Sequence, residues 1–314
     1  MPEPDPTAIA VSHLVKSYAG VTAVNDISFT VAQGEILGLL GPNGAGKSTT
    51  MRILTGYMPA TSGTVSVCGF PVTTQPDEVK RRVGYMPDSV GFYDNLTGRD
   101  NLRYTAKLCG LRGREIDERI DAAAKRVKLD YAMGKDVRTY SRGMRQRLGI
   151  AEILMKGASI AILDEPTGGL DPQATREFLE LIRSLKHDGM TILLSSHLLE
   201  MVQSICDRVA LFNRGKIGLM GKVEDLMQNV LGGSHVIRVE ATGAGVVEAI
   251  GKVPGVARVT PEGSRLRVEA SADVRGDIAR AVVQAGGDLK MIDAGEASLE
   301  DVYTRYFEGI PNAA

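Results

Sequence analysis

The sequence predicts an α/β protein built around a parallel β-sheet. Four stretches are nearly continuous runs of apolar residues, the pattern of parallel strands that are buried on both faces: 35–40, 82–86, 160–163 and 191–195. Stretches with helical patterns separate these runs, as crossover helices do in such a sheet. Hydrophobic residues make up 43% of the 314-residue chain, which is enough for a buried core.

Two further strands are expected near the N-terminus, over 8–18 and 26–31, where apolar and polar residues alternate. Gln33-Gly34 then forms a turn that leads into the buried strand at 35–40. We expect this stretch to be a buried strand that leads into the glycine-rich segment after it.

The strand pattern stops between about 95 and 157, where helices are predicted over 97–109 and 114–128. Thr97 and Asp100 have the spacing of a capping box for the first helix. After the next strand, Asp171 and Pro172 supply the N-cap and first-turn proline of a helix that runs towards His187. The helices up to about 157 indicate a helical insert within the α/β core.

The C-terminal part of the chain predicts a separate small domain. Residues 231–234 are typical of a linker. A βαββαβ order follows, with strands or helices over 235–240, 245–252, 256–260, 265–270, 274–285 and 288–293. This order indicates a ferredoxin-like fold, and a capped amphipathic helix over 298–307 is expected to pack it against another element. We therefore expect a main domain at 1–230, with a helical subdomain at about 89–157, and an accessory domain at 234–314.

Composition excludes several function classes. The 37 Lys and Arg residues nearly balance the 38 Asp and Glu residues, so no overall charge attracts nucleic acid or an anionic membrane. No uncharged apolar run approaches the ~18 residues of a membrane-spanning helix, and the acidic, proline-rich N-terminus is unlike a signal peptide. We therefore expect no nucleic-acid partner, no membrane span and a cytosolic location. The three scattered cysteines are expected to be buried small hydrophobic residues, without disulfide or zinc.

A phosphate-binding loop is predicted at Gly41–Ser48, which fits G-x-x-x-x-G-K-[ST] between a strand and the helix-forming stretch 49–54. The glycines let successive backbone N–H groups point at phosphate oxygens. Lys47 places a cation near the β and γ phosphates, and Ser48 offers a hydroxyl to Mg²⁺. The loop alone indicates only a nucleotide.

Acidic and imidazole side chains follow two other predicted strands at their carboxyl ends. Asp164 is placed to hold Mg²⁺ through water, and Glu165 to polarise the water that attacks the γ-phosphorus. His197 follows the strand at 191–195, where a parallel sheet places its ligand-facing residues, and we expect it to contact the γ-phosphate. His13, His187 and His235 have no comparable setting and are given no role.

Together these residues resemble the ATP-binding cassette (ABC) family, the nucleotide-binding subunits of ABC transporters, over residues 8 to about 230. Several elements occur in family order: Tyr18 resembles the adenine-stacking aromatic, Gly41–Ser48 the Walker A loop, Ser141 and Gly143 the signature, Asp164 and Glu165 the Walker B pair, Gly169-Leu170-Asp171 the D-loop, and His197 the switch histidine.

The resemblance implies a Mg²⁺-dependent ATPase that works as a dimer, since in this family the signature serine and glycine bind the γ-phosphate of ATP held by the partner subunit. The helix dipole agrees, because Ser141 can cap a helix whose positive end then faces an anion. A homodimer would hold two complete sites. Glu165, His197 and Lys47 are the expected catalytic residues, and the expected ATP-binding residues are Tyr18, Gly41, Pro42, Asn43, Gly44, Ala45, Gly46, Lys47, Ser48, Thr49, Ser141 and Gly143.

Two positions depart from the family pattern. The signature usually reads LSGGQ, and here Tyr140, Arg142 and Met144 replace three of those residues while the two that touch phosphate remain. Asp88 stands where the family commonly has a glutamine that senses Mg²⁺ and the attacking water. Its carboxylate can still reach Mg²⁺ through water, although it is shorter than glutamine and anionic.

The signature segment and the C-terminal domain also resemble exporter-type ABC ATPases that pair with a separate integral permease at the cytoplasmic face of the cell membrane. The cargo of that subgroup includes drugs, lipids, polysaccharides and ions, and one branch supports copper-site assembly. A soluble ABC ATPase with a non-transport partner is the alternative, but such proteins usually carry two cassettes or a coiled coil, and neither pattern occurs here. Phe92, Tyr93 and Leu96 are expected at the permease contact, or else in local core.

Overall fold

The computed structural model describes residues 7–231, 235–263, 265–295 and 299–308. The chain divides into two compact units, Met1–Lys222 and Val223–Ala314. Among the described residues, we find no helix with the length and apolar character that crossing a membrane requires.

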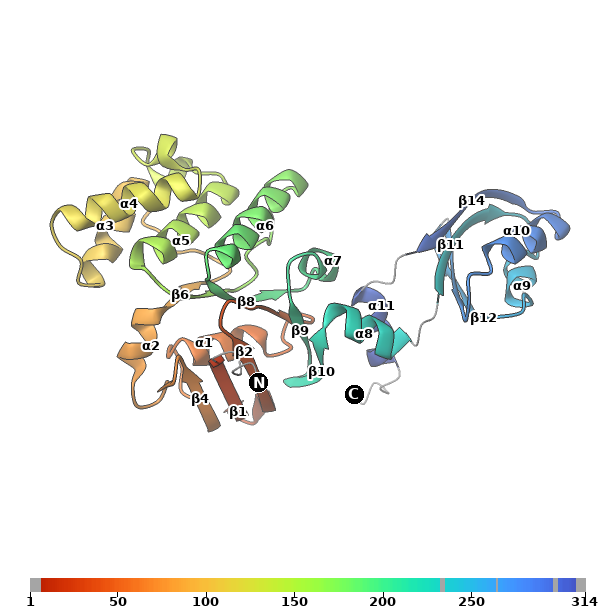
Figure 1. The fold of residues 1–314 in the computed structure, drawn as a ribbon, viewed down its shortest axis with the longest axis horizontal. Coiled ribbons are helices and arrows are strands. Elements are labelled where there is room, and N and C mark those ends of the chain that lie inside the picture. The colour runs from red at the N-terminus through yellow and green to blue at the C-terminus, as the bar shows by residue number, and fades with distance from the viewer. Residues whose placement is uncertain (1–6, 232–234, 264, 296–298, 309–314) are drawn as a thin grey trace, which may run out of the picture. The chain divides into compact units, whose positions relative to one another are not determined.

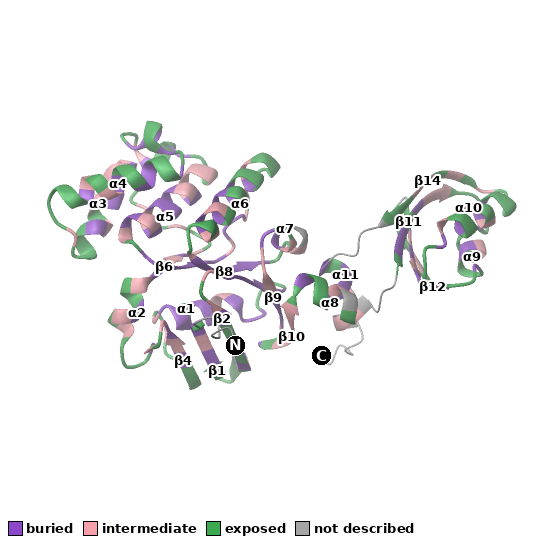
Figure 2. Cartoon of the chain, in the orientation of Figure 1, coloured by how far each residue is buried: buried purple, intermediate pink, exposed green. Residues whose placement is uncertain are grey.

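The first unit is organised around a largely parallel sheet in the order β10-β9-β3-β8-β7-β6. The strands β3 (Ile36–Leu40), β7 (Ile160–Leu163) and β8 (Thr191–Ser196) consist entirely of buried residues, as their apolar sequences predict (Figure 2). Parallel pairing aligns Leu40 with Ser196, so the loop after β3 and the residues after β7 and β8 meet at one edge of the sheet. The predicted α/β core is confirmed. The other strands are β6 (Val83–Met86), β9 (Arg208–Asn213) and the antiparallel β10 (Lys216–Lys222).

A second, antiparallel sheet covers the first, in the order β2-β1-β4-β5. Helix α1 (Lys47–Leu54) contacts β2 and β4, and its Met51, Ile53 and Leu54 join a core shared by the two sheets (Figure 1). The strands of this sheet are β1 (Thr7–Tyr18), β2 (Val21–Ala32), β4 (Ser62–Val67) and β5 (Phe70–Pro71), and helix α2 (Pro76–Arg82) follows.

Three helices form the predicted helical region: α3 (Gly98–Leu108), α4 (Arg114–Arg126) and α5 (Arg142–Lys156). They pack on one another, and α5 also packs on β6 (Figure 1). The Thr97 side chain caps α3 by accepting from the Asp100 N–H, and Ser141 caps α5 by accepting from the Met144 N–H at 3.3 Å. Asp171 caps α6 (Pro172–His187) in the same way, and the short α7 (Leu199–Gln203) follows β8.

The second unit contains a four-stranded antiparallel sheet in the order β12-β13-β11-β14. Its elements follow the βαββαβ order, and α9 and α10 contribute to one apolar core with the sheet. Their bounds are β11 (His235–Thr242), α9 (Val246–Gly251), β12 (Val256–Glu262), β13 (Arg265–Ala270), α10 (Arg275–Gln284) and β14 (Asp288–Gly295).

Helix α8 (Val223–Leu231) precedes this sheet in the sequence and α11 (Leu299–Glu308) follows it. The two helices pack against each other. Helix α8 therefore groups with the C-terminal unit, and the division falls at Lys222, before the predicted linker. The linker residues 232–234 and the predicted cap Ser298 lie outside the described residues.

The cysteines differ from expectation, because Cys109 is exposed and Cys68 and Cys206 are half-buried. Cys109 is the C-cap residue after α3, in a stretch from 107 to 110 that is exposed throughout.

Candidate functional site

The loop Gly41–Ser48 connects the buried strand β3 to α1. Gly41 (φ 150°) and Gly46 (φ 105°) have positive φ, and a Cβ would lie 2.3 Å from the Phe212 oxygen at Gly41 and 2.6 Å from the Ala23 oxygen at Gly46. Only glycine fits at these two positions, so the chain can curl tightly before the helix begins. Helix α1 begins directly after this turn with no side-chain cap, and a helix N-terminus of this kind favours an anion.

Lys47 is almost completely buried, with 4% of its surface exposed. Its ammonium group donates to the carbonyl oxygens of Gly41 at 2.6 Å and Pro42 at 3.2 Å, and it lies 3.4 Å from Glu165 Oε1. A buried ammonium group needs such partners, because an isolated charge in the interior is costly. The loop carbonyls thus hold the Lys47 ammonium group beside the segment that is expected to bind phosphate.

Asp164 follows β7 and is buried, with 3% exposure. Its Oδ1 accepts hydrogen bonds from Ser48 Oγ at 2.9 Å and from Ser195 Oγ at 2.7 Å. A carboxylate beside a hydroxyl is an oxygen donor set that suits Mg²⁺, which usually takes one or two carboxylates and completes its shell with water and phosphate oxygens. Ser48 and Asp164 therefore fit the Mg²⁺ position expected from the sequence.

The Glu165 carboxylate is held at both oxygens. Oε2 accepts from His197 Nδ1 at 2.8 Å, and Oε1, which is buried and has no hydrogen-bond partner, lies near the Lys47 ammonium. Glu165 has a positive φ of 48°, a conformation that costs a non-glycine residue ~1–3 kcal/mol. The surrounding contacts thus hold the carboxylate in one orientation at the end of β7.

His197 follows β8, and 47% of its side chain is exposed. The bond to Glu165 forms when Nδ1 carries the hydrogen, because a carboxylate can only accept. Nε2, the other ring nitrogen, then remains as the polar atom of this side chain that can contact another group. The structure thus brings together residues that the sequence predicted separately from three segments: Lys47, Ser48, Asp164, Glu165 and His197.

Ser195 is a member of this cluster that the sequence did not identify. Its hydroxyl is fully buried, donates to Asp164, and accepts from the Glu165 N–H at 2.8 Å. One hydroxyl therefore fixes both residues of the acidic pair. A polar residue that ends an apolar parallel strand beside a phosphate loop is the signal that would have identified it.

Other predicted residues make their contacts elsewhere. Tyr18 is 41% exposed, its hydroxyl donates to Met58 Sδ, and Lys16 Nζ lies 5.0 Å from its ring centroid. The exposed Ser141 caps α5, and a Cβ at Gly143 would lie 3.8 Å from both Leu170 and Ala174. The Asp88 carboxylate lies near a guanidinium group, 3.6 Å from Arg142 Nη2, which the sequence did not predict.

The fold and the phosphate-loop cluster define a nucleotide-binding ATPase of the phosphate-loop class. The sequence family described as ABC transporter matches residues 24–168. The linearmycin resistance ATP-binding protein LnrL of Bacillus subtilis is 34% identical over 266 residues, which cover 84% of this chain and 85% of LnrL. The bacitracin transport ATP-binding protein BcrA of Bacillus licheniformis is 40% identical over 212 residues, which cover 67% of this chain and 68% of BcrA.

Among solved structures, an ATP-binding subunit of an ABC transporter superposes with a TM-score of 0.64 at 30% identity, covering 71% of this chain and 93% of that subunit. The chain belongs to the ATP-binding subunits of ABC transporters. Proteins of this family bind and hydrolyse ATP.

Proposed function

We propose that two copies of this chain bind Mg²⁺-ATP between them, hydrolyse it, and drive a separate integral permease from the cytoplasmic face of the cell membrane. Transport is in the direction of export. The observation that carries the hydrolytic part is the contact series from Lys47 to Glu165 to His197, in which one carboxylate is fixed between a buried cation and an imidazole.

In this mechanism the Glu165 carboxylate accepts a proton from the water that attacks the γ-phosphorus. His197 and Lys47 orient that carboxylate, and Lys47 also stabilises negative charge on the transferred phosphoryl group. Ser48 and Asp164 would hold Mg²⁺, which neutralises phosphate charge when bound. The curled loop and the N-terminus of α1 position the phosphates through backbone N–H groups.

Dimerisation is proposed because the signature residues belong to a surface of α5. Ser141 is exposed, and it caps a 15-residue helix whose N-terminal end is electropositive. The family resemblance assigns this end to the γ-phosphate of a nucleotide on another subunit. Each chain would then supply the phosphate loop of one site and the signature of the other.

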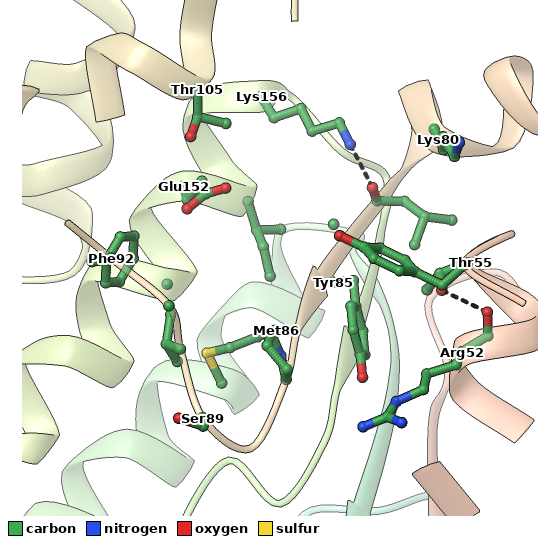
Figure 3. A pocket seen from close by; sticks show the side chains of 18 of the residues that line it. Arg52, Thr55, Lys80, Tyr85, Met86, Ser89, Phe92, Thr105, Glu152 and Lys156 are labelled. Atoms are coloured by element: carbon green, nitrogen blue, oxygen red, sulfur yellow. Dashed lines mark hydrogen bonds between the residues drawn. The ribbon is translucent and has the colours of Figure 1, made fainter. Parts of the chain in front are cut away.

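A groove in the first unit is the proposed contact with the permease. It encloses about 740 Å³ and is lined by residues of β6, the loop after it, and the facing side of α5, with Phe92, Glu152 and Lys156 among them (Figure 3). Phe92 lines this groove, whereas Tyr93 and Leu96 are 54% and 38% exposed. This exposure favours the interface role of these residues over a core role. A cytoplasmic segment of the permease is the proposed occupant.

Export is proposed from the relatives, since LnrL is named for linearmycin resistance and BcrA for bacitracin transport. Purification of the chain from membranes, followed by identification of the integral protein that comes with it, tests the transport assignment. Recovery with a soluble, non-membrane partner instead would support the alternative, a non-transport ABC ATPase.

The hydrolytic assignment is tested by Glu165→Gln. Loss of a positioned general base costs about 10²- to 10⁴-fold in turnover, so this variant should bind ATP, hydrolyse it very slowly, and accumulate as a dimer. Phosphate release and analytical ultracentrifugation with and without ATP give the two readouts. Turnover like that of the unaltered chain would contradict the role of Glu165.

A further inference from the structure

Arg142 occupies the third position of the segment Tyr140-Ser141-Arg142-Gly143-Met144, between the two residues expected to touch phosphate. Its Nη2 lies 3.6 Å from Asp88 Oδ1, and the two side chains are 52% and 61% exposed. The pair therefore joins the first turn of α5 to the loop after β6. These two segments belong to the helical region and to the α/β core, respectively.

The loop after β7 is shaped around the same guanidinium group. A Cβ at Gly169 would lie 2.9 Å from Arg142 Cζ and Nη1, and one at Gly168 would lie 3.4 Å from Arg142 Nη2 and 3.6 Å from Asp88 Oδ1. The planar group thus lies against the Gly169 backbone, where a residue with a side chain would displace it. Three segments meet at Arg142.

The place of Asp88 in the chain connects this cluster to the catalytic residues. Asp88 comes two residues after Met86, whose carbonyl oxygen accepts from the Asp164 N–H at 2.8 Å. The end of β6 is therefore fixed to the residue that begins the acidic pair. Because Asp88 contacts Arg142 of α5, the fixed end of β6 also restrains the neighbouring Ser141 and Gly143.

We propose that Arg142 is a positioning residue: paired with Asp88, it sets the orientation of Ser141 and Gly143 for the partner's nucleotide. Asp88 then acts through the signature and not as a ligand of Mg²⁺. An exposed ion pair at this distance contributes little to stability, so its loss should leave the fold intact. The expected effect is on the position of the first turn of α5. This inference rests on the proposed ATP-dependent dimer.

The test uses the full chain in the Glu165→Gln background, with ATP-dependent dimerisation measured by analytical ultracentrifugation. Asp88→Asn and Arg142→Gln should each raise the ATP concentration for half-maximal dimerisation by about two- to fivefold, the range for an exposed pair. The double variant should be no worse than either single one, and the exchange Asp88→Arg with Arg142→Asp should recover part of the loss.

A matched control is the exposed pair Arg126 and Asp188, which joins the end of α4 to the residue after α6 at 2.5 Å. Asp188→Asn and Arg126→Gln should leave the ATP requirement unchanged. A Mg²⁺ titration separates the two roles of Asp88, because a ligand role raises the Mg²⁺ requirement in Asp88→Asn alone. That result, additive effects, or no effect of Arg142→Gln would overturn the inference.

The same experiment distinguishes failure of the proposed dimeric function from failure of the positioning role of Arg142. If Glu165→Gln itself does not dimerise on ATP, the dimeric mechanism fails before Arg142 is tested. If it dimerises and the Arg142 variants behave like their parent, only the positioning role fails. Far-UV circular dichroism of each variant confirms that the comparison is between folded chains.

Discussion

At the residue scale, Ser195 shows how one hydroxyl can hold both residues of the acidic pair, one through its carboxylate and the other through its backbone. It donates to Asp164 Oδ1 and accepts from the backbone N–H of Glu165, so both bonds use the same buried oxygen. Asp164 receives a second donor from Ser48 of the phosphate loop. The acidic pair is thus linked to β8 on one side and to the nucleotide loop on the other.

Removal of this hydroxyl in Ser195→Ala should destabilise the chain and slow hydrolysis. The change leaves a buried N–H without its acceptor and Asp164 with one donor fewer, which costs ~1–3 kcal/mol in the free energy of unfolding. Urea denaturation and steady-state ATPase assays measure the two effects. Ser184→Ala, which removes a hydroxyl bonded only within α6, is the control and should change neither by a comparable amount. Equal effects of both variants would show that Ser195 has no special role.

The sequence allowed some of these residues to be predicted and not others, for physical reasons. Lys47 could be predicted from the phosphate-loop motif, and Asp164, Glu165 and His197 because a parallel sheet brings the carboxyl ends of its strands together. The contact between Asp88 and Arg142 could not, since it depends on the side-chain directions of two loops and on space left by a distant glycine.

At the scale of elements, helix α5 contributes residues to two regions of the first unit, the signature segment and the groove. Its N-terminal end carries the exposed Ser141 and Arg142, and its C-terminal half lines the groove with Glu152 and Lys156 (Figure 3). Gly157 ends the helix in a left-handed conformation. A movement of this one helix would therefore affect the signature and the groove together.

Burial raises the pKa of Glu152 above its usual value of 4.5, against smaller opposite effects of Lys156 and Thr105. Because the folded chain holds this proton more tightly than the unfolded chain, the stabilisation is complete below about pH 4.5 and is lost as the pH rises through the folded-state pKa. The free energy of unfolding relative to Glu152→Gln should therefore fall with rising pH over that interval. Urea denaturation across a pH series measures it.

Glu180→Gln removes the same charge from an exposed position of α6 and controls for net charge. The pH dependence relative to Glu152→Gln should exceed that relative to Glu180→Gln. A difference that rises with pH would mean that attraction to Lys156 outweighs burial.

Phe92 tests the groove as a contact with the permease. Phe92→Ser should weaken copurification with the integral partner and remove its effect on ATP turnover, while the isolated chain keeps its turnover within about twofold. Tyr131→Ser is the control, because Tyr131 is 68% exposed in the helical region and does not line the groove. A Phe92 variant that unfolds at markedly lower temperature would assign this ring to the core.

The sequence predicted elements that carry a strong local signal better than elements that lack one. The buried strands β3, β7 and β8 were evident because both faces are apolar, and α3 and α6 because their caps are in the sequence. No assignment was made for β4, β5, β9 and β10, whose places depend on partners elsewhere in the chain. The position of α8 in the second unit depends likewise on packing against α11.

At the scale of the whole molecule, the proposed mechanism divides each catalytic site between two chains. Lys47 and Glu165 contact each other at the edge of the parallel sheet. Ser141 and Gly143 lie at the start of α5, where Gly143 lies near Leu170 and Ala174 instead. A symmetric dimer would join the loop of one chain to the signature of the other at two equivalent sites. The two parts can then be inactivated independently.

Mixing two inactive variants, Lys47→Ala and Ser141→Arg, should therefore restore activity. In a mixed dimer one site receives both defects and the other receives none. Random exchange makes half of the dimers mixed, each with one intact site of two, so turnover should recover to about a quarter of that of the unaltered chain if the sites act independently. ATPase assays of each variant alone and of the mixture measure this. Affinity tags of two kinds establish that mixed dimers form, and no recovery in their presence would contradict the shared site.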